Sequence, residues 1–94
     1  MIHLLIRHKV RDYTSWKPVF DAHAHARTEF GCLGGTIYRS HNDVNDIAVL
    51  LRWSTIADAQ RFVASNELRN TMHAAGVVGD PQVAFLDQVT EFDR

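Results

Sequence analysis

Residues 47–53 read Ile-Ala-Val-Leu-Leu-Arg-Trp, and this stretch decides the fold. In a strand, successive side chains point to opposite faces, so the odd-numbered positions from Ile47 to Trp53 share one face and the even-numbered ones share the other. A half-exposed strand alternates apolar with polar residues, whereas this run is apolar on both faces apart from Arg52. The stretch therefore predicts a central strand whose two faces are both covered.

The segments that precede this strand predict a strand, a helix and a second strand. Residues Ile2–Val10 alternate a strongly apolar set with a mixed set, as expected of a strand with one buried face. Asp12 or Ser15 can cap a helix that runs to about Glu29. Glycines at positions 31, 34 and 35 then end the helix, and a second strand follows at about Thr36–His41.

The segments that follow it predict two short helices and a last strand. Ser54 or Thr55 caps the first of these helices, and Ser65 or Asn66 starts the second. Gly79-Asp80-Pro81 predicts a turn. The remaining stretch, Gln82–Phe92, predicts the last strand.

This βαββαβ order is the α+β, ferredoxin-like split βαβ arrangement, in which a four-stranded antiparallel sheet carries its helices on one face. We expect one such domain over residues 1–94. The helices can cover only one face of the sheet, and the other face exposes an apolar patch made of Leu5, Tyr38, Leu50 and Leu86. Exposed patches of this kind mark interfaces, so we predict a homodimer joined through the open sheet face.

Composition limits the classes of partner. The chain has 94 residues, 46% hydrophobic and 22% charged, with a formal net charge of -1, which is typical of a soluble globular protein. Such a charge provides no basic field for nucleic acid or for a membrane surface, and no apolar stretch reaches membrane-spanning length. The single Cys32 and the lack of a hydrophobic signal segment favour the cytoplasm.

His23 and Arg27 are the candidate catalytic residues, because they lie one turn apart within the apolar arc of the first helix. A neutral histidine in a cleft can act as a general base, and an arginine can bind a carboxylate, a phenolate or an oxyanion. The alternatives are a buried His23 satisfied by a polar neighbour, and an Arg27 whose stem covers the core while its guanidinium reaches water or an acid.

Six further residues are candidates for the lining of a small-molecule pocket between the first helix and the sheet. His8 and Trp53 lie near the ends of their strands on the helix side, so each either lines the pocket or belongs to the rim or the core. Met72 fills a gap or forms a wall. The full set of predicted ligand-contacting residues is His8, Tyr13, Phe20, Trp53, Met72 and Phe85.

No metal site is predicted. His23 and His25 diverge by about 200° on a helix, so they cannot share an ion within one protomer. His41-Asn42-Asp43 lacks the spacing of a calcium loop, and no motif indicates a serine or cysteine nucleophile.

Several stretches together resemble the dimeric α/β-barrel superfamily, and most closely its antibiotic biosynthesis monooxygenase-like branch. They are Arg7–Val10 with Asp12, Tyr13 and Trp16, then Ile37–Arg39, Val49–Trp53 and Ser65–Val77. The resemblance implies a dimer, a pocket inside each protomer, and cofactor-free oxygenation or proton transfer on an aromatic or polyketide-like substrate. His23 would be the base, and Arg27 would stabilise negative charge. The competing hypothesis is a non-catalytic, ligand-binding or stress-associated homodimer.

Haem chemistry is not expected. In haem-degrading members of the superfamily, a strand-one Asn, a strand-three Trp and a helix-two His form the site. Trp53 matches the Trp, but Ile6 and Met72 occupy the other two positions, and His73 lies one residue out of register. One residue turns a helix by about 100°, so His73 would point away from the inward face, and we predict no cofactor.

Overall fold

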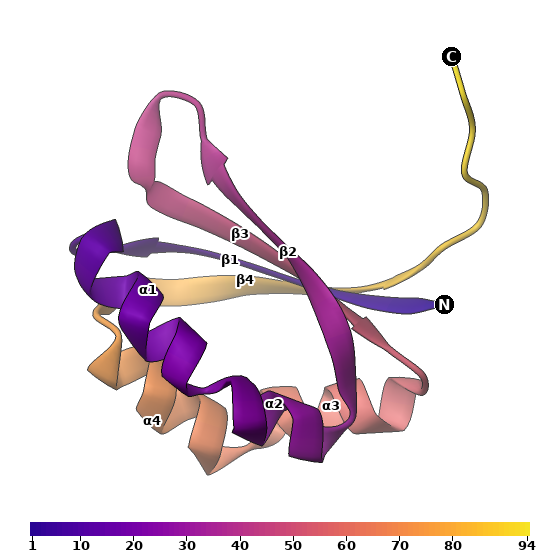
Figure 1. Cartoon of the computed structure of the whole chain (residues 1–94), viewed down its shortest axis with the longest axis horizontal. Coiled ribbons are helices and arrows are strands. Elements are labelled where there is room, and N and C mark those ends of the chain that lie inside the picture. The colour runs from indigo at the N-terminus through magenta and orange to yellow at the C-terminus, as the bar shows by residue number, and fades with distance from the viewer.

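The computed structural model describes all 94 residues, which form one four-stranded sheet and four helices (Figure 1). In chain order the elements are β1 (Ile2–Val10), α1 (Tyr13–Ala22), α2 (Ala24–Phe30), β2 (Cys32–Ser40), β3 (Asp43–Trp53), α3 (Ile56–Ala64), α4 (Asn66–Ala74) and β4 (Val77–Asp87). The strand order is β2-β3-β1-β4, and every neighbouring pair is antiparallel. The predicted ferredoxin-like α+β fold is confirmed.

All four helices lie on one side of the sheet (Figure 1). The residues that follow β4 extend away from both the sheet and the helices. None of the helices is long and apolar enough to cross a membrane. The inner strands β1 and β3 pair from Ile2 with Trp53 to Lys9 with Asp46. Paired residues share a face, so this register points the apolar set of each strand towards the helices.

Three helices begin at side-chain caps, which satisfy amide groups that have no partner within a helix. The Asp12 carboxylate accepts from the Thr14 amide at 3.0 Å, and Ser65 Oγ accepts from the Leu68 amide at 3.1 Å. Thr55 Oγ accepts from the Asp58 amide at 3.2 Å. Each of these caps is one of the two predicted for its helix.

The prediction of one continuous helix to about Glu29 is wrong, because the helix is interrupted at His23. There the backbone has φ -86° and ψ 2°, which lies outside helical geometry, and α1 ends at Ala22 while α2 begins at Ala24. Gly31 then ends α2 in the left-handed conformation with φ 109°, as glycine allows. The interruption places the His23 side chain against α4.

The predicted second strand, Thr36–His41, begins too late, because Gly34 and Gly35 lie inside β2, which begins at Cys32. A Cβ at Gly35 would stand 2.2 Å from the backbone oxygen of Leu50, so only glycine permits this close strand pairing. The pairing register also shifts between Cys32 and Gly34. Glycine here marks an irregular strand and not its boundary.

The last strand is also displaced from the prediction, running over Val77–Asp87 instead of Gln82–Phe92. Arg7 pairs with Gln82, whereas Lys9 pairs with Val78, so residues 79–81 bulge out of the ladder. The predicted Gly79-Asp80-Pro81 turn is therefore wrong. A bulge tolerates proline and left-handed glycine as well as a turn does, since neither residue has to join the regular ladder.

The hydrophobic core lies between the sheet and the helices, as the apolar faces of β1 and β3 predict. Leu4, Ile47 and Trp53 are fully buried there, together with Phe62 of α3. The opposite face of the sheet has no covering layer (Figure 1). Tyr38 and Leu86 expose 54% and 43% of their surface on it.

Candidate functional site

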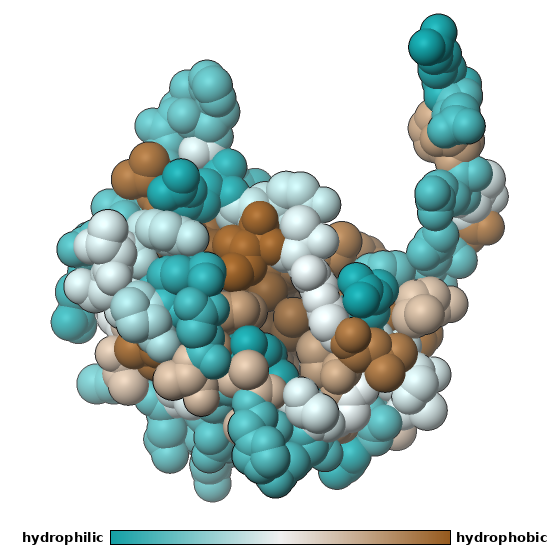
Figure 2. All heavy atoms as spheres, viewed as in Figure 1, coloured by the Kyte–Doolittle hydropathy of each residue, from teal (hydrophilic) through white to brown (hydrophobic).

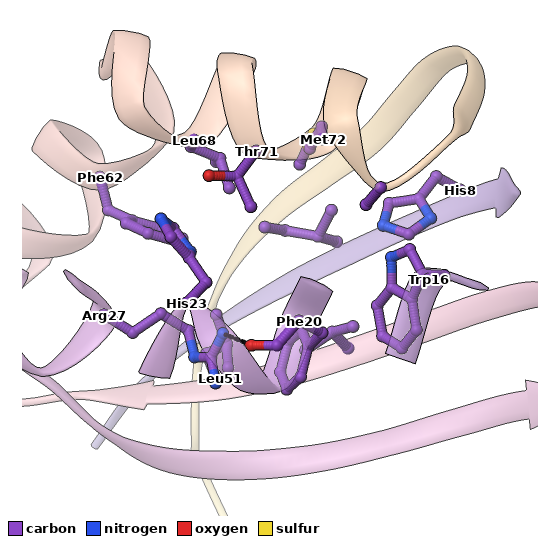
Figure 3. Close-up of a pocket in the computed structure, with 13 residues that line it drawn as sticks. His8, Trp16, Phe20, His23, Arg27, Leu51, Phe62, Leu68, Thr71 and Met72 are labelled. Carbon is purple, nitrogen blue, oxygen red and sulfur yellow. Dashed lines mark hydrogen bonds between the residues drawn. The ribbon is translucent and has the colours of Figure 1, made fainter. Parts of the chain in front are cut away.

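A partly open pocket lies between α1, α4 and the helix-facing side of the sheet (Figure 3). Its cavity volume is about 40 Å³. Thirteen residues line it: Ile6, His8, Trp16, Phe20, His23, Arg27, Val49, Leu51, Phe62, Leu68, Thr71, Met72 and Ala75. Two histidines and one arginine among mostly apolar walls give the few convergent polar groups that characterise small-molecule sites.

His23 is held by a carboxylate from the facing helix. Its Nε2 lies 3.0 Å from Glu67 Oε1, while the ring packs at 6.4 Å, centroid to centroid, from Phe62. His23 is 9% exposed, whereas the Glu67 side chain is 53% exposed. With an ionised Glu67, Nε2 carries the proton and Nδ1 keeps its lone pair, which is the tautomer that a general base needs.

Arg27 brings a guanidinium group to the same end of the pocket without an acidic partner. Its Nη1 donates to the Phe20 carbonyl at 2.7 Å, and its Cζ stands 3.8 Å from the centroid of the Phe20 ring. No carboxylate lies within ion-pair distance of it. Burial lowers the pKa of Arg27, which the Cys32 thiol and Asp21 partly oppose. A partly buried cation with unused donors favours an anionic partner.

His8 lies at the other end of the pocket, beside Trp16 (Figure 3). It is 7% exposed, its ring centroid is 5.9 Å from that of Trp16, and its Nδ1 has no hydrogen-bond partner. Burial lowers the pKa of His8, and the ring's own backbone and Asp46 partly oppose that shift. The ring is therefore neutral near pH 7.

Helix α4 forms the wall facing α1. Leu68, Thr71 and Met72 point from it into the pocket, whereas His73 is exposed and does not line the pocket (Figure 3). This agrees with the predicted helix register, because adjacent residues on a helix diverge by about 100°. Nowhere in the structure do three His, Cys, Asp or Glu side chains converge as metal ligands.

Five predicted site residues come together in this pocket: His8, Phe20, His23, Arg27 and Met72. Three others do not line it. Tyr13 packs outside, against Trp16 at 5.8 Å and below the Arg39 guanidinium at 4.4 Å. Trp53 is fully buried behind Phe62, whose ring is 5.2 Å away, and Phe85 is 40% exposed on the edge strand β4.

Sequence reasoning did not select three residues that define the site. Trp16 was named only among the residues that carry the family resemblance and not in the lining, and Phe62 had only helical periodicity to mark it. Glu67 carried no signal, because it is an exposed acid 44 residues from His23 in the sequence. Only the docking of α4 against the break at His23 brings that pair together.

A second hollow opens between α1 and β2, with apolar atoms at its floor (Figure 2). Its walls include Cys32, Gly34, Gly35 and Ile37 of β2. It shares four residues with the first pocket, namely Phe20, Arg27, Val49 and Leu51. The stacked Phe20 and Arg27 side chains thus border both hollows.

The fold is shared with several solved structures. SnoaB, a cofactor-independent oxygenase from Streptomyces nogalater, superposes with a TM-score of 0.78 at 14% identity, over 99% of this chain and 97% of that one. An antibiotic biosynthesis monooxygenase gives 0.72 at 14% identity, over 96% of this chain and 100% of that one. Rv0793 from Mycobacterium tuberculosis gives 0.71 at 16% identity, over 98% of both chains.

No protein-family model matches the chain, and no curated protein matches it either. The structural likeness extends over nearly the whole chain, although the sequence identities are low. The protein therefore has the ferredoxin-like fold of antibiotic biosynthesis monooxygenase-like proteins, as the sequence resemblance implied. Because one fold serves many chemistries, its reaction has to be argued from the pocket.

Proposed function

We propose that this protein is a cofactor-free enzyme that removes a proton from a planar aromatic or polyketide-like substrate. The observation that carries the proposal is the His23–Glu67 pair at 3.0 Å beside an unpaired Arg27 in one apolar pocket. The pocket's mostly apolar walls suit an apolar ring system. The similar fold of a cofactor-independent oxygenase supports the same class of chemistry.

In the proposed reaction, Nδ1 of His23 takes a proton from an acidic carbon or hydroxyl group of the substrate. Glu67 holds the Nε2 proton and stabilises the imidazolium that forms. Arg27 stabilises the negative charge left on the substrate, where its donors are shielded from water. The anion then reduces dioxygen in an oxygenation, or takes a proton at another atom in an isomerisation.

Anthrone, a planar carbon acid, tests this proposal. We expect wild type to speed the exchange of its methylene protons with deuterium oxide under argon, and to convert anthrone and dioxygen to anthraquinone and water in air. His23→Gln should lose roughly 10²- to 10⁴-fold of this rate, the usual share of a general base. His25→Gln is the matched control, because His25 pairs with Glu29 at 2.8 Å but its side chain is 87% exposed.

Fluorescence titration of anthrone separates catalysis from binding alone. Binding without any rate above that of buffer would favour the non-catalytic ligand-binding hypothesis. Equal rates in wild type and His23→Gln would exclude His23 as the base. Absence of both binding and exchange would overturn the proposed pocket for substrates of this class.

We also propose that the protein is a homodimer joined through the open sheet face. The exposed Tyr38 and Leu86 and the half-buried Leu5 and Leu50 give this face an apolar surface that a second copy would cover. Sedimentation at micromolar concentration should give a dimer. Leu50→Arg should yield a monomer, whereas the control Ile56→Arg, at an exposed position of α3, should remain dimeric. A monomeric wild type would overturn this proposal.

A further inference from the structure

The hollow between α1 and β2 is the larger of the two hollows that Arg27 borders. Its cavity volume is about 320 Å³, against about 40 Å³ for the pocket that contains His23. Small-molecule sites have volumes of about 300 to 1,000 Å³, so this hollow is large enough for a compact ligand. Neither His23 nor Glu67 lines it, so the proposed proton transfer gives this space no role.

The floor of this hollow is apolar (Figure 2). It contains Ile37 of β2 together with Val49 and Leu51 of β3. Ile37 pairs with Val49, and Gly35 pairs with Leu51, so no side chain from β2 stands beside Leu51. Such a floor favours the apolar part of a ligand, because contact with it removes apolar surface from water.

Arg27 places a positive charge at the border of this hollow and is itself held in position. Its Nη1 donates to the Phe20 carbonyl at 2.7 Å, and its Cζ lies 3.8 Å from the centroid of the Phe20 ring. The Phe20 ring in turn stacks on Trp16 at 5.0 Å, centroid to centroid. A guanidinium group that is already ordered loses less conformational entropy when it binds an anion.

The other donors of Arg27 are free. Its Nε and Nη2 make no hydrogen bond within the protein, and neither atom is fully buried, so both can reach a ligand. No carboxylate of the protein lies within ion-pair distance of Arg27. Two neighbouring N–H groups of a guanidinium match the two oxygens of a carboxylate, so the missing partner fits a carboxylic acid.

We propose that this hollow is a binding site for a small monocarboxylic acid whose apolar part is about the size of one ring. The carboxylate accepts from Arg27, and the apolar part lies on Ile37, Val49 and Leu51. The inference goes beyond the proposed function, because this ligand does not contact His23. Since Arg27 borders both hollows, a bound acid also competes with the anion that Arg27 stabilises in the proposed reaction.

Benzoate and its neutral analogue benzamide test this site in NMR titrations of the 15N-labelled protein. The two compounds have the same ring, but only benzoate carries a negative charge for Arg27. Wild type should bind benzoate with a roughly millimolar Kd, and about 10- to 100-fold more tightly than benzamide, as expected of a charge-assisted hydrogen bond. The backbone amide signals of Gly34, Gly35 and Ile37 should be among those that shift most.

Arg27→Gln should abolish the preference for benzoate. Arg39→Gln is the matched control and should keep it. Arg39 also lies over an aromatic ring, that of Tyr13 at 4.4 Å, and has no acid within ion-pair distance, but it does not line the hollow.

Three results would overturn the site: no saturable binding of benzoate, equal binding of both compounds to wild type, or a preference that persists in Arg27→Gln. Benzoate that shifts signals far from β2 instead of those of Gly34 and Gly35 would overturn it as well. The titration involves no proton transfer, so failure here is distinguishable from failure of the proposed function, which the exchange of anthrone protons measures.

Discussion

The two faces of the sheet are built from the same strands but have opposite surroundings. On the helix-facing side Leu4 is fully buried, whereas its neighbour Leu5 points to the open side and is only half-buried. The covered face contains the pocket with its two buried histidines, and the open face contains an apolar patch and an exposed ion pair. This difference underlies the two proposals made above, a ligand pocket on the covered face and a dimer joined through the open face.

The largest expected effect comes from truncating the same residue type on either face. Leu4→Ala should lower the free energy of unfolding by about 2 to 5 kcal/mol, because it leaves a cavity in a closely packed core. Leu5→Ala should cost clearly less at concentrations where the chain is monomeric, and more as concentration favours the dimer. Urea unfolding at two protein concentrations measures both; equal, concentration-independent losses would remove the distinction between the faces.

An effect of medium size, on the pH dependence of stability, is expected from the buried His8 on the covered face. Because burial holds its pKa below the unfolded value of about 6.5, the unfolded chain binds more protons as pH falls below that value. Stability should then fall with decreasing pH by up to about 1.4 kcal/mol per pH unit, until the pH passes below the folded pKa. His8→Asn should have a flatter dependence between pH 7 and 5. An unchanged slope in that variant would show that His8 titrates normally.

The smallest effect is expected from the ion pair on the open face. Arg7 Nη2 lies 2.9 Å from Asp46 Oδ2 and Nε lies 3.2 Å from Oδ1, and the hydrogen bond from Arg7 is the main cause that lowers the pKa of Asp46. Its stabilising contribution is present above the unfolded value of about 3.8 and is lost as pH falls through the lower folded pKa.

Asp46→Asn and Arg7→Gln should each make the unfolding temperature fall less steeply with decreasing pH. The two changes should have a similar small effect, because either one removes the same contact. Thermal unfolding between pH 5 and 2 measures this. A pH dependence that stays the same in both variants would show that the pair contributes nothing measurable, as is common for exposed ion pairs.

The parts of the fold that follow from local patterns could be predicted from the sequence. Alternating apolar residues in Ile2–Val10 and the unbroken run from Ile47 predicted the two inner strands, and the caps Asp12, Thr55 and Ser65 were among the predicted helix starts. These features depend on residues within a few positions of one another. The helix periodicity likewise placed Met72 towards the pocket and His73 away from it.

The irregular parts could not be predicted, because they depend on contacts between distant segments. The bulge at residues 79–81 exists because β4 pairs with β1, and Gly35 lies inside β2 because β3 passes too close for a side chain. Sequence reasoning read both glycine-containing stretches as ends of elements. The position of Trp53 behind Phe62 was equally inaccessible, since only the packing of α3 on β3 places one ring over the other.

The sequence by itself determined the α+β order, the two apolar faces of the central strand and the candidates His23, Arg27 and His8, because periodicity and residue type are local properties. Only the tertiary structure decided which polar atoms have partners. It joined His23 to Glu67 across 44 residues, left Arg27 without an acid and left Nδ1 of His8 unpaired. Hydrogen bonding and desolvation depend on distances between elements, and the folded packing alone fixes those distances.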